Sequence, residues 1–326
     1  MKVIDILNSR KSPFPSLEFV PPLKGSDINV LYQSLEPLME FQPPFINITS
    51  HKEDVVYFEQ KDGTMGKKTV SKRPGTVAIA AAVMKRFPIE VVPHIICAGM
   101  TKYQIENQLI DLDFLDIQNV MALRGDGDGE KKIFTPVEGG YFHTDKLVEQ
   151  IKNLNEGKYL DSGLENPVHT DFCIGVAGYP EKHFEAESLQ TDILNLKKKV
   201  DAGATHLVTQ LFFDNNHFYE FMDKVEKAGI RVPIEAGIMP VINKAQIERT
   251  VSMCGARFPV KFSKMINKYA NDPVALKDAG IAFATEQIID LINNDVRGIH
   301  LYTMNNVDTA TRITNSIANI IASCNK

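Results

Sequence analysis

Met121-Ala122-Leu123-Arg124-Gly125-Asp126 is the stretch that decides the fold, because an apolar run typical of a buried strand ends there in an arginine and an aspartate. Two further apolar runs end in polar groups in the same way, SLEFV at residues 16–20 and VTQL at residues 208–211. A closed barrel of parallel strands brings the carboxyl ends of its strands to one mouth, where the catalytic residues of barrel enzymes lie. The sequence therefore predicts a barrel with a polar site at its mouth.

Short apolar runs alternate with longer segments of helical periodicity along the whole chain. In residues 187–202, for example, Leu189, Ile193 and Leu196 recur at spacings of three or four, as on one face of a helix. Most of the short runs are continuously apolar, which is typical of parallel strands covered on both faces. We therefore expect a single α/β domain over residues 1–326, folded as a (β/α)8 TIM barrel. The eight predicted strands are residues 16–20, 45–49, 90–95, 120–123, 172–177, 206–211, 233–236 and 298–302.

Three segments depart from the plain strand-and-helix unit. Residues 57–75, rich in lysine and glycine, and residues 125–144, which hold five glycines, are predicted to be long loops at the mouth. Residues 256–272 are predicted to contain an extra helix before the last helix and strand.

Composition narrows the class of protein. A chain of 326 residues with 44% hydrophobic residues can bury a sizeable core, and its net charge of -5 argues against nucleic acid as a partner. The amino terminus does not resemble a secretory signal, and no apolar run reaches the length of a membrane helix, so we expect a cytoplasmic protein. The four cysteines form no CxxC pair, and the first strand lacks a pair of histidines. A metal site is therefore not expected.

Glu18 lies inside a predicted strand between Leu17 and Phe19, where an unpaired carboxylate is costly. It is either an acid paired with a lysine or arginine inside the barrel, or a carboxyl whose pKa its apolar surroundings raise. The second would let it donate a proton near neutral pH. Pro21 and Pro22, which fix the exit of the chain from the strand, favour this second interpretation.

The sequence Arg124-Gly125-Asp126 allows three interpretations. Nothing else indicates an extracellular adhesion protein, and the run that begins at Asp126 lacks the glycine and glutamate of a calcium loop. As the end of a strand beside a ligand it fits, because a glycine permits close approach of the backbone. Neither GxGxxG after the first strand nor GxxxxGK occurs, so a Rossmann or P-loop nucleotide site is not expected.

Several stretches in order along the chain resemble the methylenetetrahydrofolate reductase family. They are LEF before Pro21-Pro22, ALRGD at residues 122–126, AGYPE at residues 177–181 with His183 and Glu185, NLK and KVDAGA between residues 195 and 204, Thr209-Gln210 before Phe213-Asp214, and YTMN at residues 302–305. The resemblance covers essentially the whole chain.

The resemblance implies a flavoprotein. FAD would lie across the mouth, a nicotinamide cofactor, NADH or NADPH, would deliver hydride to it, and 5,10-methylenetetrahydrofolate would then be reduced to 5-methyltetrahydrofolate at the same site. A flavin- and folate-binding subunit that relies on a redox partner such as a ferredoxin is the alternative. A non-flavin barrel lyase would need a Schiff-base lysine at a strand end, and none is evident. A homo-oligomer stays open.

The resemblance also assigns residues. Glu18 corresponds to the general acid that opens the folate ring, Asp126 to the acid near flavin and pterin, and Gln210, Gln246 and Asn306 to substrate-binding positions. The positions that match FAD contacts are Thr49, His94, Arg124, Gly125, Asp126, Ala177, Tyr179, His183, Asp192, Asn195 and Lys199. Asp192, Asn195 and Lys199 are spaced as on one helix face.

Two positions depart from the bacterial pattern of the family. Thr250 stands where an aromatic residue is common, and Asn306 stands where an arginine commonly follows the last strand. Both belong to the region that handles nicotinamide and folate, so the choice of electron donor and the recognition of the folate tail stay open.

Overall fold

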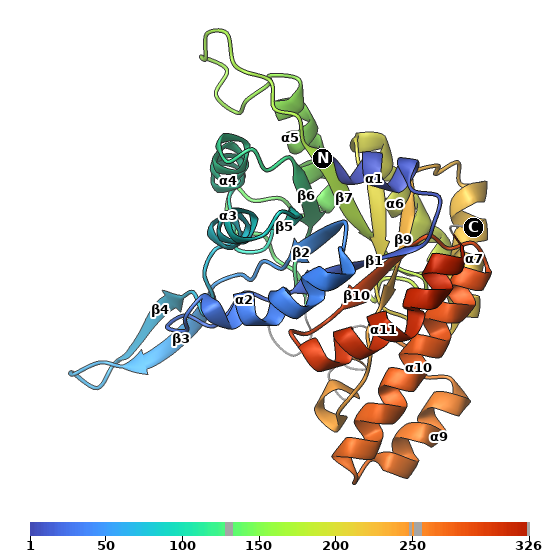
Figure 1. Cartoon of the computed structure of the whole chain (residues 1–326). Coiled ribbons are helices and arrows are strands. Elements are labelled where there is room, and N and C mark those ends of the chain that lie inside the picture. The colour runs from blue at the N-terminus through green and yellow to red at the C-terminus, as the bar shows by residue number, and fades with distance from the viewer. Residues whose placement is uncertain (128–132, 248–249, 251–255, 325–326) are drawn as a thin grey trace.

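The computed structural model describes residues 1–127, 133–247, 250 and 256–324. Within them, eight parallel strands close into a barrel in the order β1-β10-β9-β8-β7-β6-β5-β2, which confirms the predicted TIM barrel (Figure 1). The barrel strands are β1 (Phe14–Phe19), β2 (Phe45–Ile48), β5 (Glu90–Ile96), β6 (Asn119–Leu123), β7 (Cys173–Gly178), β8 (His206–Thr209), β9 (Ile234–Ile238) and β10 (Gly298–Tyr302).

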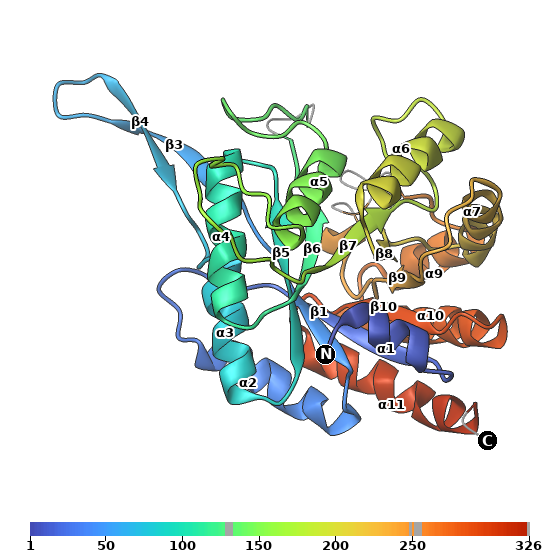
Figure 2. The same ribbon diagram turned by 90° about the horizontal axis from the view of Figure 1, so that it is seen from above.

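Helices surround these strands, as the view from above shows (Figure 2). Helix α4 begins at a capping box, in which Thr101 and Gln104 satisfy each other's backbone groups. The side chain of Asp272 caps α10 in a similar way. The helices are α1 (Val3–Ser9), α2 (Asn29–Leu35), the 3-10 helix η1 (Glu36–Phe41), α3 (Thr76–Arg86), α4 (Lys102–Phe114), α5 (Thr144–Asn155), α6 (Leu189–Ala202), α7 (Asn215–Lys227), α9 (Val260–Tyr269), α10 (Pro273–Asn293) and α11 (Val307–Ser323).

An apolar plug closes the amino-terminal end of the barrel. Val3 and Ile6 of α1 pack against Phe14, Phe45 and other buried side chains near the starts of the strands. Removing this apolar surface from water holds α1 in place. The opposite end, where the strands finish, is left as the mouth.

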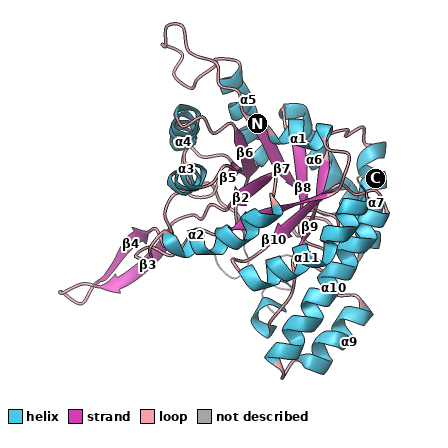
Figure 3. Cartoon of the chain, viewed as in Figure 1, coloured by secondary structure: helices cyan, strands magenta, loops and turns pink. Residues whose placement is uncertain are grey.

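The segment predicted as a loop over residues 57–75 is instead largely a hairpin. Strands β3 (Asp54–Glu59) and β4 (Met65–Val70) pair in antiparallel fashion and project from the barrel as an arm (Figure 3). Asp62 accepts a hydrogen bond from the amide of Thr64, and Gly63 has a φ of 81°. Lys61, Asp62 and Gly63 thus form a three-residue hairpin loop with glycine at the left-handed position, a common hairpin connection. The prediction failed because the lysines and glycines of the segment masked this signal.

The other two segments that depart from the strand-and-helix unit are residues 256–272 and residues 125–144. Helix α9 confirms the extra helix, since it lies within residues 256–272 and precedes α10 and β10. In the predicted loop over residues 125–144, no helix lies between residues 133 and 143, and residues 128–132 lie outside the described part.

Two of the described cysteines are buried, as expected. Burial raises the pKa of the Cys97 thiol to about 12 and also raises that of Cys173, so both are poor nucleophiles. Cys324 is exposed, and Cys254 lies outside the described residues. No helix in the described part of the chain combines the length and the apolar character needed to cross a membrane.

Candidate active site

Alternate residues of each barrel strand face the interior, so the polar positions of the strands meet inside the barrel. Ser16 lies opposite His300, and Glu18 lies opposite Tyr302 on one side and Asn47 on the other. These positions are closer to the carboxyl ends of the strands than Phe14 and Phe45 of the plug. The barrel interior is therefore apolar at its floor and polar toward the mouth.

Glu18 lies between two histidines. Its Oε2 is 3.6 Å from Nε2 of His94 and 3.5 Å from Nε2 of His300, and its side chain is 15% exposed. The partners are thus imidazoles and not the lysine or arginine of the first interpretation.

The expected rise in the pKa of Glu18 is wrong in direction. Burial raises the pKa of this carboxyl, but a hydrogen bond from His300 and the charges of His94, His300 and His51 outweigh it, so the pKa lies below its ordinary value. The surroundings are polar rather than apolar because the neighbouring strands place imidazoles against the carboxylate. Burial lowers the pKa of His94 to about 4.

The chain that leaves β1 is fixed by residues that follow β10. The amide nitrogen of Val20 donates to Oδ1 of Asn305, and Nδ2 of Asn305 donates to the carbonyl of Val20, both at 2.8 Å. The hydroxyl of Thr303 donates to the carbonyl of Glu18 at 2.6 Å. Asn305 and Thr303 therefore hold the segment that carries the candidate acid, a role that the sequence analysis did not assign to them.

Behind Glu18 lies a buried polar group that the sequence analysis also missed. The hydroxyl of Ser16 is 2.6 Å from Oε2 of Glu235 and 2.8 Å from Nδ1 of His300, and all three side chains are almost fully buried. The available signal was Glu235 itself, a carboxylate inside a predicted apolar strand just as Glu18 is.

Arg124 begins the loop after β6 and forms a two-pronged ion pair. Its Nη1 and Nη2 donate to the Glu185 carboxylate at 2.6 and 2.8 Å, and its guanidinium lies over the ring of Phe134. Gly125 has a φ of 84°, where a side chain would be strained and a Cβ would lie 2.7 Å from Ala98. Asp126 is exposed, and its carbonyl accepts a hydrogen bond from Lys52. The glycine thus turns the chain out of β6 and exposes the aspartate.

His183 belongs to a second part of the site, after β7. Its backbone amide donates to Asp192 of α6, and its ring packs edge-on against Tyr179 at 4.8 Å. Burial and the nearby cations, Arg124 first, lower the pKa of His183 to about 4, so the imidazole is neutral at pH 7. Glu185 accepts from Arg124, which holds the pKa of its carboxyl below the ordinary value.

Helix α6 supplies a cation to the same region. Nζ of Lys199 donates to the carbonyl of Ala177 on β7, and burial lowers the pKa of this amine to about 8. Asp192 lies near Lys199, and burial raises the pKa of the Asp192 carboxyl. Asn195 is exposed and accepts from Lys198. Lys199 therefore reaches β7 and Asp192 reaches the loop that follows it, whereas Asn195 lies at the surface.

The three predicted substrate positions make no hydrogen bonds to one another and bind separate partners among the described residues. Gln210 follows β8 and accepts from the amide of Leu211, and Gln246 accepts from the amide of Ile242. Asn306 caps α11 by accepting from the amide of Thr309. Each is partly exposed. The cap on α11 gives Asn306 a structural role in addition to any contact with substrate.

The mouth offers the unused polar atoms that a flavin would need. The buried Oγ1 of Thr49, a predicted FAD contact, and the side-chain amide of Asn47 lack a hydrogen-bond partner among the described residues. Nε2 of His94, another predicted FAD contact, makes no hydrogen bond there and has only its ionic contact with Glu18. Arg124 and Lys199 supply positive charge for a pyrophosphate. These residues fit a dinucleotide with a ring that forms hydrogen bonds.

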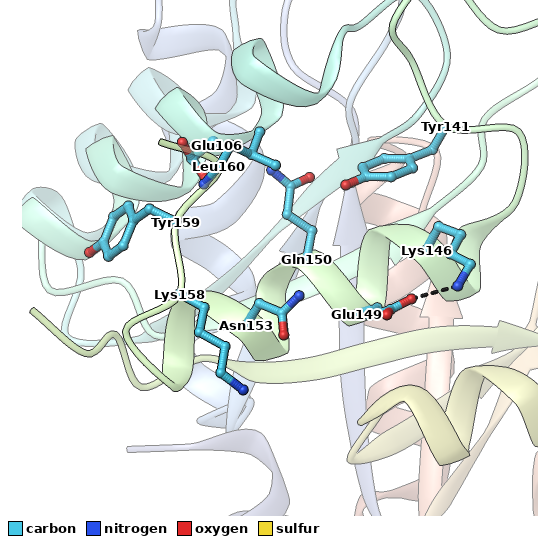
Figure 4. A pocket seen from close by; sticks show the side chains of 9 residues that line it. All are labelled: Glu106, Tyr141, Lys146, Glu149, Gln150, Asn153, Lys158, Tyr159 and Leu160. Carbon is cyan, nitrogen blue, oxygen red and sulfur yellow. Dashed lines mark hydrogen bonds and ion pairs between the residues drawn. The ribbon is translucent and has the colours of Figure 1, made fainter. Parts of the chain in front are cut away.

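A separate cavity of about 230 Å³ lies on the outside of the barrel between α4 and α5, with Glu106, Tyr141 and Gln150 among its lining residues (Figure 4). None of the predicted site residues lines it, so it is not part of the mouth. No group of three histidine, cysteine, aspartate or glutamate side chains in the described ranges could hold a metal ion.

Comparisons with known proteins give the family. A model of the methylenetetrahydrofolate reductase family matches residues 2–318. The relative from Arabidopsis thaliana named methylenetetrahydrofolate reductase (NADH) 1 is 33% identical over 318 residues, which cover 94% of this chain and 49% of the plant protein. The 5,10-methylenetetrahydrofolate reductase of Pectobacterium carotovorum subsp. carotovorum is 30% identical over 304 residues, covering 93% of this chain and 89% of that protein.

A solved structure supports the fold alone. An uncharacterized protein from Clostridium thermocellum, described as binding two copies of 5-methyl-5,6,7,8-tetrahydrofolic acid, aligns with a TM-score of 0.57 at 11% identity, covering 96% of this chain and 99% of that one. The present chain spans about half the length of the plant relative and most of the length of the bacterial one. From the family match over nearly its whole length, the chain belongs to the methylenetetrahydrofolate reductase family.

Proposed function

We propose that this protein reduces 5,10-methylenetetrahydrofolate to 5-methyltetrahydrofolate with FAD as its cofactor and NADH or NADPH as electron donor, the two substrates using one site in turn. Membership of the family supports the reaction. The observation that carries the proposal is the position of Glu18, a partly exposed carboxyl held between two imidazoles at the carboxyl end of β1.

The chain's own residues would share three tasks. Glu18 would give a proton to the folate ring nitrogen whose bond breaks, and Asn305 would hold the Glu18 segment in place through Val20. Arg124 and Lys199 would bind the phosphates of the cofactor. When bound, the flavin would accept hydride from the nicotinamide and give it to the folate.

A two-step spectroscopic experiment tests the proposal. Purified protein should be yellow and should lose its flavin absorbance on anaerobic addition of NADH or NADPH, and methylenetetrahydrofolate should then restore that absorbance. Colourless protein that gains no flavin on incubation would refute the proposal.

The variant Glu18→Gln separates the two steps. Flavin reduction by NADH should stay within about tenfold, whereas folate reduction should fall by at least about 10²-fold, as expected for a lost general acid. Glu286→Gln is the matched control and should leave both steps unchanged. Glu286 is an exposed residue of α10 that pairs with Lys261 of α9. Equal losses in both steps would assign Glu18 a structural role.

The same experiment tests the alternative function, a flavin- and folate-binding subunit that takes electrons from a redox protein. In that case NADH and NADPH would both fail to reduce the flavin, whereas chemically reduced protein would still reduce methylenetetrahydrofolate.

A further inference from the structure

A continuous line of proton-bearing groups runs from the barrel interior to Glu18. Glu235 of β9 is 0% exposed and contacts Ser16 of β1 at 2.6 Å, Ser16 contacts His300 of β10 at 2.8 Å, and His300 lies 3.5 Å from Glu18. His300 is already one of the two imidazoles beside Glu18, whereas Glu235 and Ser16 have no task in the proposed function. Burying a carboxyl at this depth destabilises the fold unless the carboxyl is protonated or fully paired.

The hydrogen bonds in this line permit two arrangements. If Glu235 is ionised, Ser16 donates to it and accepts from Nδ1 of His300, so a neutral His300 turns the lone pair of Nε2 toward Glu18. If Glu235 is protonated, it donates to Ser16, Ser16 donates to Nδ1, and Nε2–H of His300 faces Glu18. A neutral imidazole has one donor and one acceptor nitrogen, so Ser16 fixes which of them faces the site.

We propose that Glu235 is a buried proton reservoir for Glu18 and that Ser16 and His300 carry the proton between them. The proton of Glu235 passes to Oγ of Ser16, the hydroxyl proton of Ser16 passes to Nδ1 of His300, and the proton on Nε2 passes to Glu18. Glu235 ends as a carboxylate and Glu18 as a neutral acid, while Ser16 and His300 regain their original charge. This inference rests on the proposed function, in which Glu18 protonates the folate.

The surroundings of the two carboxyls favour the resting state, in which Glu235 holds the proton and Glu18 is ionised. Transfer to Glu18 is therefore uphill, and it would be drawn forward when Glu18 passes the proton on to the folate nitrogen. Oε1 of Glu235 is buried without a hydrogen-bond partner among the described residues, which disfavours the carboxylate, and burial raises the pKa of this group. Among the described residues, the polar side chains that interact with Glu235 are those of Ser16 and His300. Both features favour the protonated form of Glu235 over the carboxylate.

The pKa of Glu18 is shifted in the opposite direction to that of Glu235. Its pKa lies below the ordinary value despite burial, because His300, His94 and His51 face it, so it is ionised near neutral pH and must receive a proton before it can act as an acid. His94, with a pKa of about 4, is neutral at pH 7 and is therefore not an acid that could supply this proton. A folate that covers the mouth would cut Glu18 off from water, so a proton stored behind it would be the available source. After product release, Glu18 would take a proton from solvent and return it along the same line.

The variant Glu235→Gln tests the reservoir, because glutamine keeps the size and can donate to Ser16 but cannot release a proton. We expect the folate half-reaction to slow at least tenfold at pH 7.5 and to recover toward acid pH, where solvent can protonate Glu18. Flavin reduction by NADH should stay within about twofold. Ser16→Ala should behave in the same way, and Ser16→Thr, which restores the hydroxyl, should recover the rate.

Glu90→Gln is the matched control, since Glu90 is a strand-borne glutamate at the amino-terminal end of the barrel and lies outside this line. It should leave the folate half-reaction and its pH profile unchanged. If Glu235→Gln leaves the pH profile of folate reduction unchanged, or slows both half-reactions equally, the reservoir is refuted.

An infrared measurement separates the failure of the reservoir from the failure of the proposed function. At pH 7 the wild-type protein should show the carbonyl band of a protonated carboxyl, and Glu235→Gln should lack it, whether or not the protein reduces folate. If the wild-type protein shows this band but does not reduce methylenetetrahydrofolate, the proposed function alone is refuted. If the band is absent, the reservoir is refuted.

Discussion

Replacing Lys199 with methionine should stabilise the flavin-free protein at pH 7. Burial lowers the pKa of Lys199 from 10.5 to about 8, so the folded state holds this proton more weakly than the unfolded state does. Between about pH 8 and pH 10.5 the unfolded chain binds more protons than the folded protein, so the free energy of unfolding rises with pH over this range. A shift of this size corresponds to about 3 kcal/mol when the amine is charged in both states. Partial exposure of the side chain and its hydrogen bond to Ala177 reduce the net effect.

We therefore expect Lys199→Met to raise the free energy of unfolding by about 1 to 2 kcal/mol at pH 7, with a smaller difference at pH 9.5. Urea unfolding of flavin-free protein at both pH values measures this, and Lys227→Met, at an exposed position on α7, is the control. Flavin affinity should fall by about 10- to 100-fold, because a charge-assisted contact of about 1.5 to 3 kcal/mol is lost. A stability difference that does not change with pH, or unchanged flavin binding, would refute this reasoning.

Three further substitutions address the mouth. Asn305→Ala, which removes both hydrogen bonds to Val20, should cost about 1 to 3 kcal/mol in urea unfolding and slow folate reduction more than flavin reduction; equal slowing would contradict the anchoring role. Asp126→Asn should raise the flavin midpoint potential, since a negative charge opposes a reduced ring, and an unchanged potential in a redox titration would contradict this. Asn306→Arg should lower the melting temperature by losing a cap worth about 1 kcal/mol, yet lower the folate KM by pairing with a tail carboxylate. If KM does not change, and removing Lys264 of α9 has no effect on it either, tail recognition lies elsewhere.

The periodicity of the chain was enough to predict the barrel. Continuous apolar runs such as residues 120–123 mark strands covered on both faces, and helical spacing such as that of Leu189, Ile193 and Leu196 marks the outer layer. These patterns are local, so they can be recognised in the sequence without knowledge of the fold. The arm of β3 and β4 was missed because the lysines and glycines of β4 and of the turn outweighed the apolar residues of β3, which are largely exposed and do not belong to the core.

The position of Glu18 at a strand end was also readable, since an acid in an apolar run stands out in the sequence. Its chemical environment was not. The pKa of Glu18 depends on His94 and His300, which are 76 and 282 residues away along the chain and meet it only because β1 lies next to β10 and the barrel closes. The sequence therefore determined which strand carries the acid and what family the chain resembles. The closed barrel alone decided which side chains face that acid, because inward positions of distant strands meet only when the sheet closes on itself.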